Sequence, residues 1–458
     1  MRNRTLIWTG VTTLAMVLAG CDSYRSEIIQ PQKELADLNA RSATSVAAQV
    51  HAYQQGPVTP QYNPDAPLNE AEMVMVALAF NPDLRGRRIA ATQLGSTSIG
   101  AIINLSPELH VNLNSVTAGV GTDTEVLYTL LVPSARAAWY DADHARTEQA
   151  RAEILAAESA VASDVRYGHM ALRIAWSQLK LSESQVVRCQ DFLLDVERGP
   201  RQAGDELSPA LVIWEVAELH AQLRATQAHL GVVRSSLNAL LGFNPDYPLK
   251  VDDLEIPLPM PAAAEPTDAE IDAEILAGRF ELKATEAQVR RDDYEARRKA
   301  FEQYPVLRLG PAITYNRGEG SSFTLGASMH VPWPEHAEQE YDNARVQRSH
   351  DRATYVERLH NYRVDAHAAC DRMRTARLEL ESEKGDLIVA SAHARELLDE
   401  AWKGHAISAR DYLTAMRQQS EDERRHLAAQ SKWLLARIDL DRSTGRLNTI
   451  TTPGSATP

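Results

Sequence analysis

The side chains able to do chemistry in this sequence are few and scattered. It contains no P-loop, no Gly-x-Ser-x-Gly, no Cys-x-x-Cys and no His-Glu-x-x-His pattern. His360 and His367 lie seven residues apart on one predicted helix, where they could bind a metal, line a passage or simply be solvated. Cys189 and Cys370 could pair in an oxidising compartment or be two ordinary helix cysteines. Because nothing favours catalysis, we expect no enzyme activity, no cofactor and no metal site.

The third cysteine, Cys21, has a context that predicts lipidation. Residues 1–20 start with two arginines and continue with an apolar stretch too short to span a bilayer comfortably, as in a signal peptide. The sequence Leu18-Ala19-Gly20-Cys21 resembles the bacterial lipobox, in which the cysteine is acylated and becomes the first mature residue. Several acyl chains would anchor the protein firmly. Asp22 resembles the inner-membrane retention signal of enterobacterial lipoproteins, so sorting to the inner membrane stays open.

Composition excludes several classes of protein. The 458 residues include 62 acidic and 48 basic ones, a net charge of -14, whereas a nucleic-acid binder needs a basic face. Three cysteines are too few for a disulfide scaffold or a zinc cluster. Beyond the signal peptide no run approaches 18 apolar residues, so we expect no transmembrane helix.

The elements that must position these residues repeat at an interval of about 198 residues. Leu84 matches Leu282 and Pro107 matches Pro305 at this interval, and later anchors follow in the same order. The sequence therefore divides into a lipoprotein signal peptide (1–20), a lipidated N-terminal segment (21–68), a first repeat (69–244), a Pro-rich linker (245–266), a second repeat (267–446) and a C-terminal tail (447–458).

Each repeat is predicted to open with one helix and two strands. The helices are expected at 69–94 and 267–302. Apolar and polar residues then alternate with a period of two, which is typical of strands that face two different solvents. The strands are expected at 108–116, 124–132, 306–315 and 323–331, with turn-like linkers at Thr117–Asp123 and Asn316–Ser322.

A long helical hairpin is predicted to end each repeat. Residues 134–197 and 335–452 contain no proline, and 64 helical residues would extend about 96 Å. Apolar residues there step by four and three, which favours coiled-coil packing. Polar breaks at Glu197–Glu206 and Lys403–Ser408 mark the hairpin tips, where Gly204 and Gly404 are natural turn positions.

Taken together, the lipobox, the twofold repeat and the strand–strand–hairpin order resemble the TolC-type outer membrane efflux family, in particular its lipidated branch. Local patterns at 77–85, 304–310 and 404–413 match, and the resemblance covers roughly 69–446. It implies a mainly α fold with β, in which four strands per chain complete a trimeric twelve-stranded β-barrel on an α-helical coiled-coil periplasmic tunnel. It also implies a passive outer-membrane exit duct that meets a periplasmic adaptor (membrane fusion protein) and an inner-membrane pump.

The need for several copies also follows from physics. Four strands cannot close a barrel, since bacterial outer-membrane barrels begin at eight strands. An open sheet edge cannot face lipid. If these strands span the outer membrane, the chain must therefore form an oligomer.

The resemblance places the functional positions at the hairpin tips. Asp411 matches an aspartate that projects into the closed periplasmic aperture, so three copies would make an acidic ring, although a solvated helix carboxylate is the alternative. The family's second aspartate and its gate tyrosine fall at Thr414 and Trp402, and Arg410 lies close to the position of its gate arginine. The family's gating bonds can therefore be transferred to this sequence only in part. The tips are also expected to dock the adaptor, near the residues Gly204, Ser208, Gly404 and Ser408.

Two alternatives remain at this point. A periplasmic adaptor also combines a lipobox with a helical hairpin, but it has one hairpin where this chain has two in tandem. A non-channel scaffold lipoprotein held at the inner membrane would account for Asp22, but it does not need the strand pairs. The exported compound cannot be deduced, and no Met-rich or His-rich cluster points to copper or silver.

Overall fold

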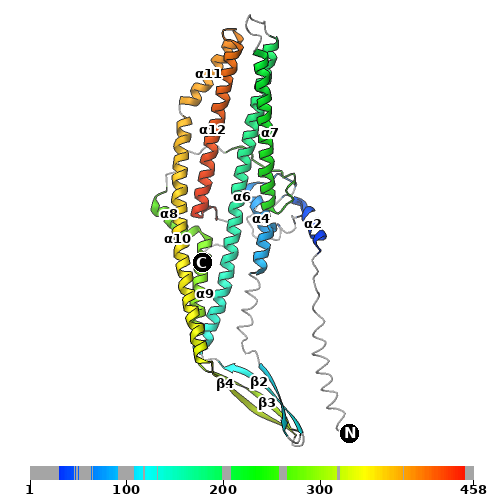
Figure 1. Cartoon of the computed structure of the whole chain (residues 1–458), viewed down its shortest axis with the longest axis vertical. Coiled ribbons are helices and arrows are strands. Elements are labelled where there is room, and N and C mark those ends of the chain that lie inside the picture. The colour runs from blue at the N-terminus through cyan, green and yellow to red at the C-terminus, as the bar shows by residue number, and fades with distance from the viewer. Residues whose placement is uncertain are drawn as a thin grey trace.

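The computed structural model shows an elongated molecule with a β-sheet at one end and two long helical hairpins leading away from it (Figure 1). It describes residues 30–45, 47, 50, 63, 65–90, 108–116, 119–130, 133–198, 208–256, 266–316, 320–384 and 386–448. No helix within these ranges has the length and apolar character needed to cross a membrane.

Matching capping boxes open the two halves of the chain. Helix α4 (Glu70–Phe80) begins at Asn69, whose side chain accepts a hydrogen bond from the Glu72 amide at 2.9 Å while Glu72 accepts one from the Asn69 amide. Helix α8 (Asp268–Gly278) has the same box, formed by Thr267 and Glu270. Such boxes satisfy amide groups that a helix N-terminus leaves without partners, and they stand at equivalent places in the two repeats.

The prediction of one uninterrupted helix at the start of each repeat is wrong. Helix α4 ends at Phe80 and residues 82–90 form a second helix, while α8 is followed after Arg279 by α9 (Phe280–Glu302). The break residues use their side chains elsewhere. Asn81 donates to the carbonyl of Leu240 at 3.1 Å, and Arg279 donates to the carbonyl of Arg442 at 2.9 Å. The residue at each break therefore binds the C-terminal end of the long hairpin of its own repeat.

One antiparallel sheet joins the two halves in the order β1-β2-β3-β4. Its strands are β1 (Glu108–Val116), β2 (Gly119–Leu130), β3 (Val306–Asn316) and β4 (Gly320–His330). Val116 pairs with Gly119 and Asn316 with Gly320, so most residues expected in the linkers Thr117–Asp123 and Asn316–Ser322 belong to strands instead. The pairing of β2 with β3 crosses between the repeats, and β1 and β4 are the outer strands.

The first hairpin consists of α6 (Pro133–Arg198) and α7 (Ser208–Leu241), and the second of α10 (Pro334–Lys384), α11 (Asp386–Lys403) and α12 (Ala409–Thr444). Helix α6 is continuous, as predicted. The ascending arm of the second hairpin consists of α10 and α11, and α11 leans toward α12 (Figure 1). Helix α12 ends at a left-handed Gly445, close to the predicted end of the second repeat at 446, and the short 3₁₀ helix η1 (Arg446–Asn448) follows.

A glycine closes each hairpin against the first helix of its own repeat. Gly242 and Gly445 have φ angles of 78° and 83°, in the left-handed region that favours glycine. A Cβ at Gly242 would lie 2.7 Å from the carbonyl oxygen of Phe80, and one at Gly445 would lie 2.7 Å from that of Gly278. Arg41, in the N-terminal segment, donates to the carbonyls of both Phe80 and Gly242 and ties this segment to the same junction.

The hydrophobic core lies mostly in the middle of the long axis. Around the first repeat, side chains of α4, α6 and α7 bury one another, with Met73, Val165 and Leu237 at the centre. Around the second, α8, α10 and α12 do the same through Ile271, Ala366 and other residues. A separate cluster lies near the hairpin ends, where the two hairpins meet.

Candidate functional site at the hairpin tips

The turn of the second hairpin is a Schellman motif centred on His405. The amide of His405 donates to the carbonyl of Trp402 at 3.0 Å, and that of Ala406 donates to the carbonyl of Ala401 at 2.8 Å. His405 has a φ of 56° and so occupies the left-handed position. Gly404 lies in the turn, as the sequence suggested, directly after the last residue of α11, and its amide donates to the carbonyl of Glu400 at 2.8 Å.

Asp411 belongs to the cap of helix α12. The Asp411 amide donates to Ser408 Oγ at 3.2 Å, and the Ser408 hydroxyl donates to Asp411 Oδ2 at 2.7 Å. Asp411 and Arg410 are exposed, as is Thr414, whose hydroxyl donates to the Arg410 carbonyl at 2.9 Å. The carboxylate of Asp411 thus stabilises the turn of its own chain and remains open to solvent. Of the other predicted positions, α7 begins at Ser208, while Gly204 and Cys21 lie outside the described residues.

Trp402 does not stand alone at the tip but joins an aromatic cluster between the hairpins. Its ring stacks on Tyr412 at a centroid distance of 5.3 Å and meets Phe192 of α6 edge-on at 5.1 Å. Phe192 also contacts Tyr412 at 4.7 Å. Apolar residues of both hairpins surround these rings, including Val212 and Leu413. The cluster therefore holds α11 and α12 against α6.

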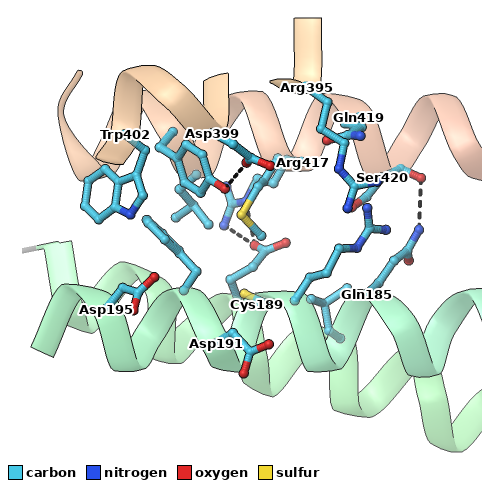
Figure 2. Close-up of a pocket in the computed structure, with 17 residues that line it drawn as sticks. Gln185, Cys189, Asp191, Asp195, Arg395, Asp399, Trp402, Arg417, Gln419 and Ser420 are labelled. Carbon is cyan, nitrogen blue, oxygen red and sulfur yellow. Dashed lines mark hydrogen bonds and ion pairs between the residues drawn. The ribbon is translucent and has the colours of Figure 1, made fainter. Parts of the chain in front are cut away.

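A cavity of about 200 Å³ adjoins the aromatic cluster (Figure 2). Trp402 and Asp399 line it from the second hairpin, and Asp195 and Cys189 line it from α6. The Tyr412 hydroxyl donates to Asp399 Oδ1 at 2.7 Å. Burial, followed by this bond and the Asp399 charge, raises the pKa of Tyr412, so the phenol stays protonated at any physiological pH.

Two ion pairs link the hairpins beside this cavity. Arg188 of α6 binds Glu423 of α12 through both guanidinium nitrogens, with Nη1 to Oε1 at 2.9 Å. Burial opposes the ionisation of Glu423, but the bonds from Arg188 outweigh it and lower the pKa of this carboxyl. Arg417 of α12 similarly pairs with Glu215 of α7. The bidentate, partly buried Arg188–Glu423 pair is of a kind that holds geometry well.

No local sequence signal marks these ion pairs. Arg188 and Glu423 are 235 residues apart, and each has the polar character of any solvated helix residue. An amide network extends the contact, since Gln185 donates to the Ser420 carbonyl at 3.2 Å and accepts from Arg424 Nε at 3.0 Å. Only the packing of the two hairpins brings these groups together.

The cysteines and histidines do not form a site in the described part of the chain. Cys189 and Cys370 are buried in different clusters and form no disulfide with each other. Burial, with a smaller effect of Glu215, raises the pKa of Cys189 to about 11 and keeps it a thiol. His360 is exposed, and His367 lies 3.6 Å from Asp268. No group of three or more potential ligands able to hold a metal occurs among the described residues.

Comparison with known proteins identifies the fold. No family model and no curated protein matches the sequence. Solved structures do match, among them the outer-membrane channel OprN, with a TM-score of 0.67 at 17% identity over 82% of this chain and 89% of that one. The MtrE outer membrane channel of Neisseria gonorrhoeae gives 0.66 at 18% identity over 82% and 88%, and CusC gives 0.65 at 13% over 86% and 96%. The chain has the fold of TolC-type outer-membrane channels, as the sequence resemblance predicted.

Proposed function

We propose that this protein is the outer-membrane channel of a tripartite efflux or secretion system. It would be a passive duct that conducts substrates from a periplasmic adaptor and an inner-membrane pump to the exterior, and not an enzyme. The observation that carries the proposal is the combination of an open four-stranded sheet with two tandem hairpins of the TolC type. The tandem hairpins argue against a periplasmic adaptor, and the sheet argues against a scaffold.

The free edges of the sheet are the reason to expect that several copies of the chain assemble. Its strands β1 and β4 each have one unpaired edge, which cannot lie in a bilayer unless another chain covers it. Along β4, Phe323 and Leu325 are 76% and 75% exposed, an apolar face of the kind that contacts lipid. Three copies would bring twelve strands together and close the barrel. Acylation of Cys21 would add an anchor in the same membrane, and the tips near Gly204 and Gly404 would meet the adaptor.

The contacts between the hairpins suggest how the duct is held closed. If α11 and α12 swing away from α6 and α7, the Arg188–Glu423 and Arg417–Glu215 pairs must separate. Asp411, exposed beside the turn, would then belong to an acidic ring at the aperture that favours cations. Substrate selection would rest with the pump, because nothing in the described cavity favours one compound.

Channel recording in a planar bilayer tests this function. The purified protein should give discrete conductance steps, and Arg188→Ala combined with Arg417→Ala should raise the open probability. Lys432→Ala is the matched control, since Lys432 pairs with Glu379 inside the second hairpin and should leave gating unchanged. A folded protein that remains a monomer in detergent, or that inserts without ever conducting, would exclude the channel.

A further inference from the structure

The cavity between the hairpins has a basic end and an end that is acidic and aromatic. Two of the helices that line it, α6 and α11, both run toward the tips and contribute residues at steps of four and three, so each set lies on one helical face. In the direction of the tips the sets are Arg188, Phe192 and Asp195 on α6, and Arg395, Asp399 and Trp402 on α11. The arginines therefore lie away from the tips, and the carboxylates and rings lie closer to them (Figure 2).

The arginines around this cavity are engaged by carboxylates of the chain itself. Arg188 binds Glu423 through both guanidinium nitrogens, and Arg417 pairs with Glu215. Burial opposes the ionisation of Glu423, but Arg188 and, to a smaller extent, the charge of Arg395 lower its pKa. An anionic ligand would have to compete with these internal partners.

The carboxylates of the cavity, in contrast, lack a cationic partner. Asp399 accepts a hydrogen bond from the neutral Tyr412 hydroxyl at 2.7 Å, which leaves its charge uncompensated. Asp191 and Asp195 form no hydrogen bond or ion pair in the part of the chain that the structure describes. Burial and Asp399 raise the pKa of Tyr412 most, and the charge of Asp195 adds to this effect, so both carboxylates act on the same place.

An aromatic wall stands beside these carboxylates. Trp402 stacks on Tyr412 and meets Phe192 edge-on, and it is only partly buried where it lines the cavity. The π-system of an indole attracts a cation, and this attraction adds to that of a carboxylate nearby. Uncompensated carboxylates next to a tryptophan are therefore suited to an organic ammonium group.

The volume of the cavity limits the size of such a ligand. It is about 200 Å³, and a cavity of about 150 Å³ can hold a benzene molecule. A single ring with a short side chain would fit, and a much larger compound would not. A metal ion would make no use of the aromatic wall, and no group of three or more metal ligands occurs among the described residues.

We propose that the tip end of this cavity is a binding site for a small organic cation, of the class of a primary amine carried on one ring. The ammonium group would lie between Asp195 and Asp399, and the ring would contact Trp402. Charge and size select a class of compounds at this site. The site would regulate the hairpins and would not choose the exported substrate.

The position of the site gives its ligand an effect on the hairpins. Asp195 belongs to α6 of the first hairpin, whereas Asp399 and Trp402 belong to α11 of the second. A ligand held from both sides loses contacts when the hairpins separate, so it stabilises the closed arrangement. This effect on opening rests on the proposed channel function, whereas the binding itself does not.

Equilibrium dialysis of the purified protein in detergent tests the binding. Labelled 2-phenylethylamine should bind saturably at neutral pH, and 2-phenylethanol, which has a similar shape without the charge, should not displace it. Asp195→Asn should weaken the affinity about tenfold. This variant should fold normally, because Asp195 is exposed and bonds no other residue of the described chain. The matched control is Glu197→Gln, which removes an exposed carboxylate of α6 outside the cavity lining and should leave the affinity unchanged.

A second variant and a second measurement complete the test. Asp399→Asn keeps an oxygen that can accept the Tyr412 hydroxyl, and it should also weaken the affinity about tenfold. In planar bilayers, 2-phenylethylamine added on the side of the hairpin tips should lower the open probability of the wild type. The same addition should leave the open probability of Asp195→Asn unaltered.

The outcomes separate the site from the channel. Displacement of the amine by 2-phenylethanol, or an unchanged affinity in both aspartate variants, would overturn the site. Saturable binding with an unaltered open probability would support the site and overturn its effect on the hairpins. A protein that never conducts would remove the proposed function, and the dialysis would still decide whether the site exists.

Discussion

At the scale of single residues, Asp292 of α9 and Asp351 of α10 form a buried acid pair outside the hairpin tips. Both are 4% exposed. Gln288 and Gln347 donate to Asp351 at 2.9 and 3.2 Å, so Asp351 carries the charge and its pKa is lowered although burial opposes ionisation. Arg291 donates to Asp292 Oδ1 at 2.7 Å, whereas Asp292 Oδ2 accepts no hydrogen bond. Burial, then the bond to Asp351, raises the pKa of Asp292 to about 6.

This pair predicts a dependence of stability on pH. An unfolded aspartate ionises near pH 4, whereas folded Asp292 keeps its proton to about pH 6. Its contribution is therefore fully present below about pH 4 and is lost as the pH rises to about 6. Asp292→Asn should stabilise the protein by about 1–3 kcal/mol at pH 7.5, and by much less at pH 4.5. Denaturant unfolding followed by circular dichroism measures both values.

A neighbouring residue provides the control for this experiment. Asp293 is exposed and pairs with Arg348 at the surface at 2.9 Å. Asp293→Asn removes the same charge from the same helix, and should change stability by less than about 1 kcal/mol at either pH. Equal pH slopes for wild type and Asp292→Asn would show that folding does not raise the pKa of Asp292.

Replacing the carboxylate of Asp411 by an amide tests the proposed acidic ring. Asp411→Asn keeps an oxygen that can accept the Ser408 hydroxyl, so the cap survives while the charge is lost. The ratio of cation to anion permeability, measured from reversal potentials in a salt gradient, should fall. Glu421→Gln removes an exposed charge ten residues further along α12 and should leave the ratio unchanged. An unaltered ratio for Asp411→Asn would identify it as a solvated carboxylate with a capping role only.

At the scale of elements, the two closing glycines should be the least replaceable. Gly242→Ala and Gly445→Ala each combine a left-handed backbone with a Cβ at most 2.7 Å from the backbone of the first helix. We expect each to cost about 3 kcal/mol or more, or to prevent folding. Gly231→Ala, in the middle of α7 with open space around it, should instead gain up to about 1 kcal/mol. Denaturation midpoints would contradict this account if all three variants behaved alike.

The Schellman turn at the second tip contains a position at which a substitution should stabilise the protein. His405 adopts the left-handed conformation, which costs a non-glycine residue about 1–2 kcal/mol. His405→Gly should recover about 1 kcal/mol and raise the unfolding temperature, partly offset by the freedom that glycine adds to the unfolded chain. Ala406→Gly, next to it and without a left-handed φ, should be neutral or destabilising. A loss of stability with His405→Gly would mean that the histidine side chain supports the turn.

Local periodicity explains how much of the fold could be predicted from the sequence. Strand alternation and the four–three steps along α6 depend only on neighbouring residues, so the element order followed from them. The breaks at Asn81 and Arg279 depend on bonds to Leu240 and Arg442, which only the folded chain supplies. Trp402 shows the same limit at the tip, because its aromatic partner Phe192 lies 210 residues earlier.

At the scale of the whole molecule, the proposed lipid anchor predicts where the protein resides in the cell. Cys21→Ser should abolish labelling with palmitate, because the thiol is the acylation site in the lipobox reading of residues 18–21. Cys189→Ser, which alters a buried thiol, should keep the label. Fractionation of the wild type should recover it in the outer membrane. Recovery only in the inner membrane would favour retention through Asp22 and a scaffold role.

The pairing of β2 with β3 bears on how the molecule evolved. Within one chain this pairing joins the second strand of one half to the first strand of the other, and a ring of copies would repeat it between β4 and β1. The two halves also share a capping box and a closing glycine at equivalent places. An ancestral gene for one half could therefore have built the ring from six identical products, and its fusion in tandem freed the halves to diverge. The lean of α11 toward α12, in contrast to the continuous α6, is one mark of that divergence (Figure 1).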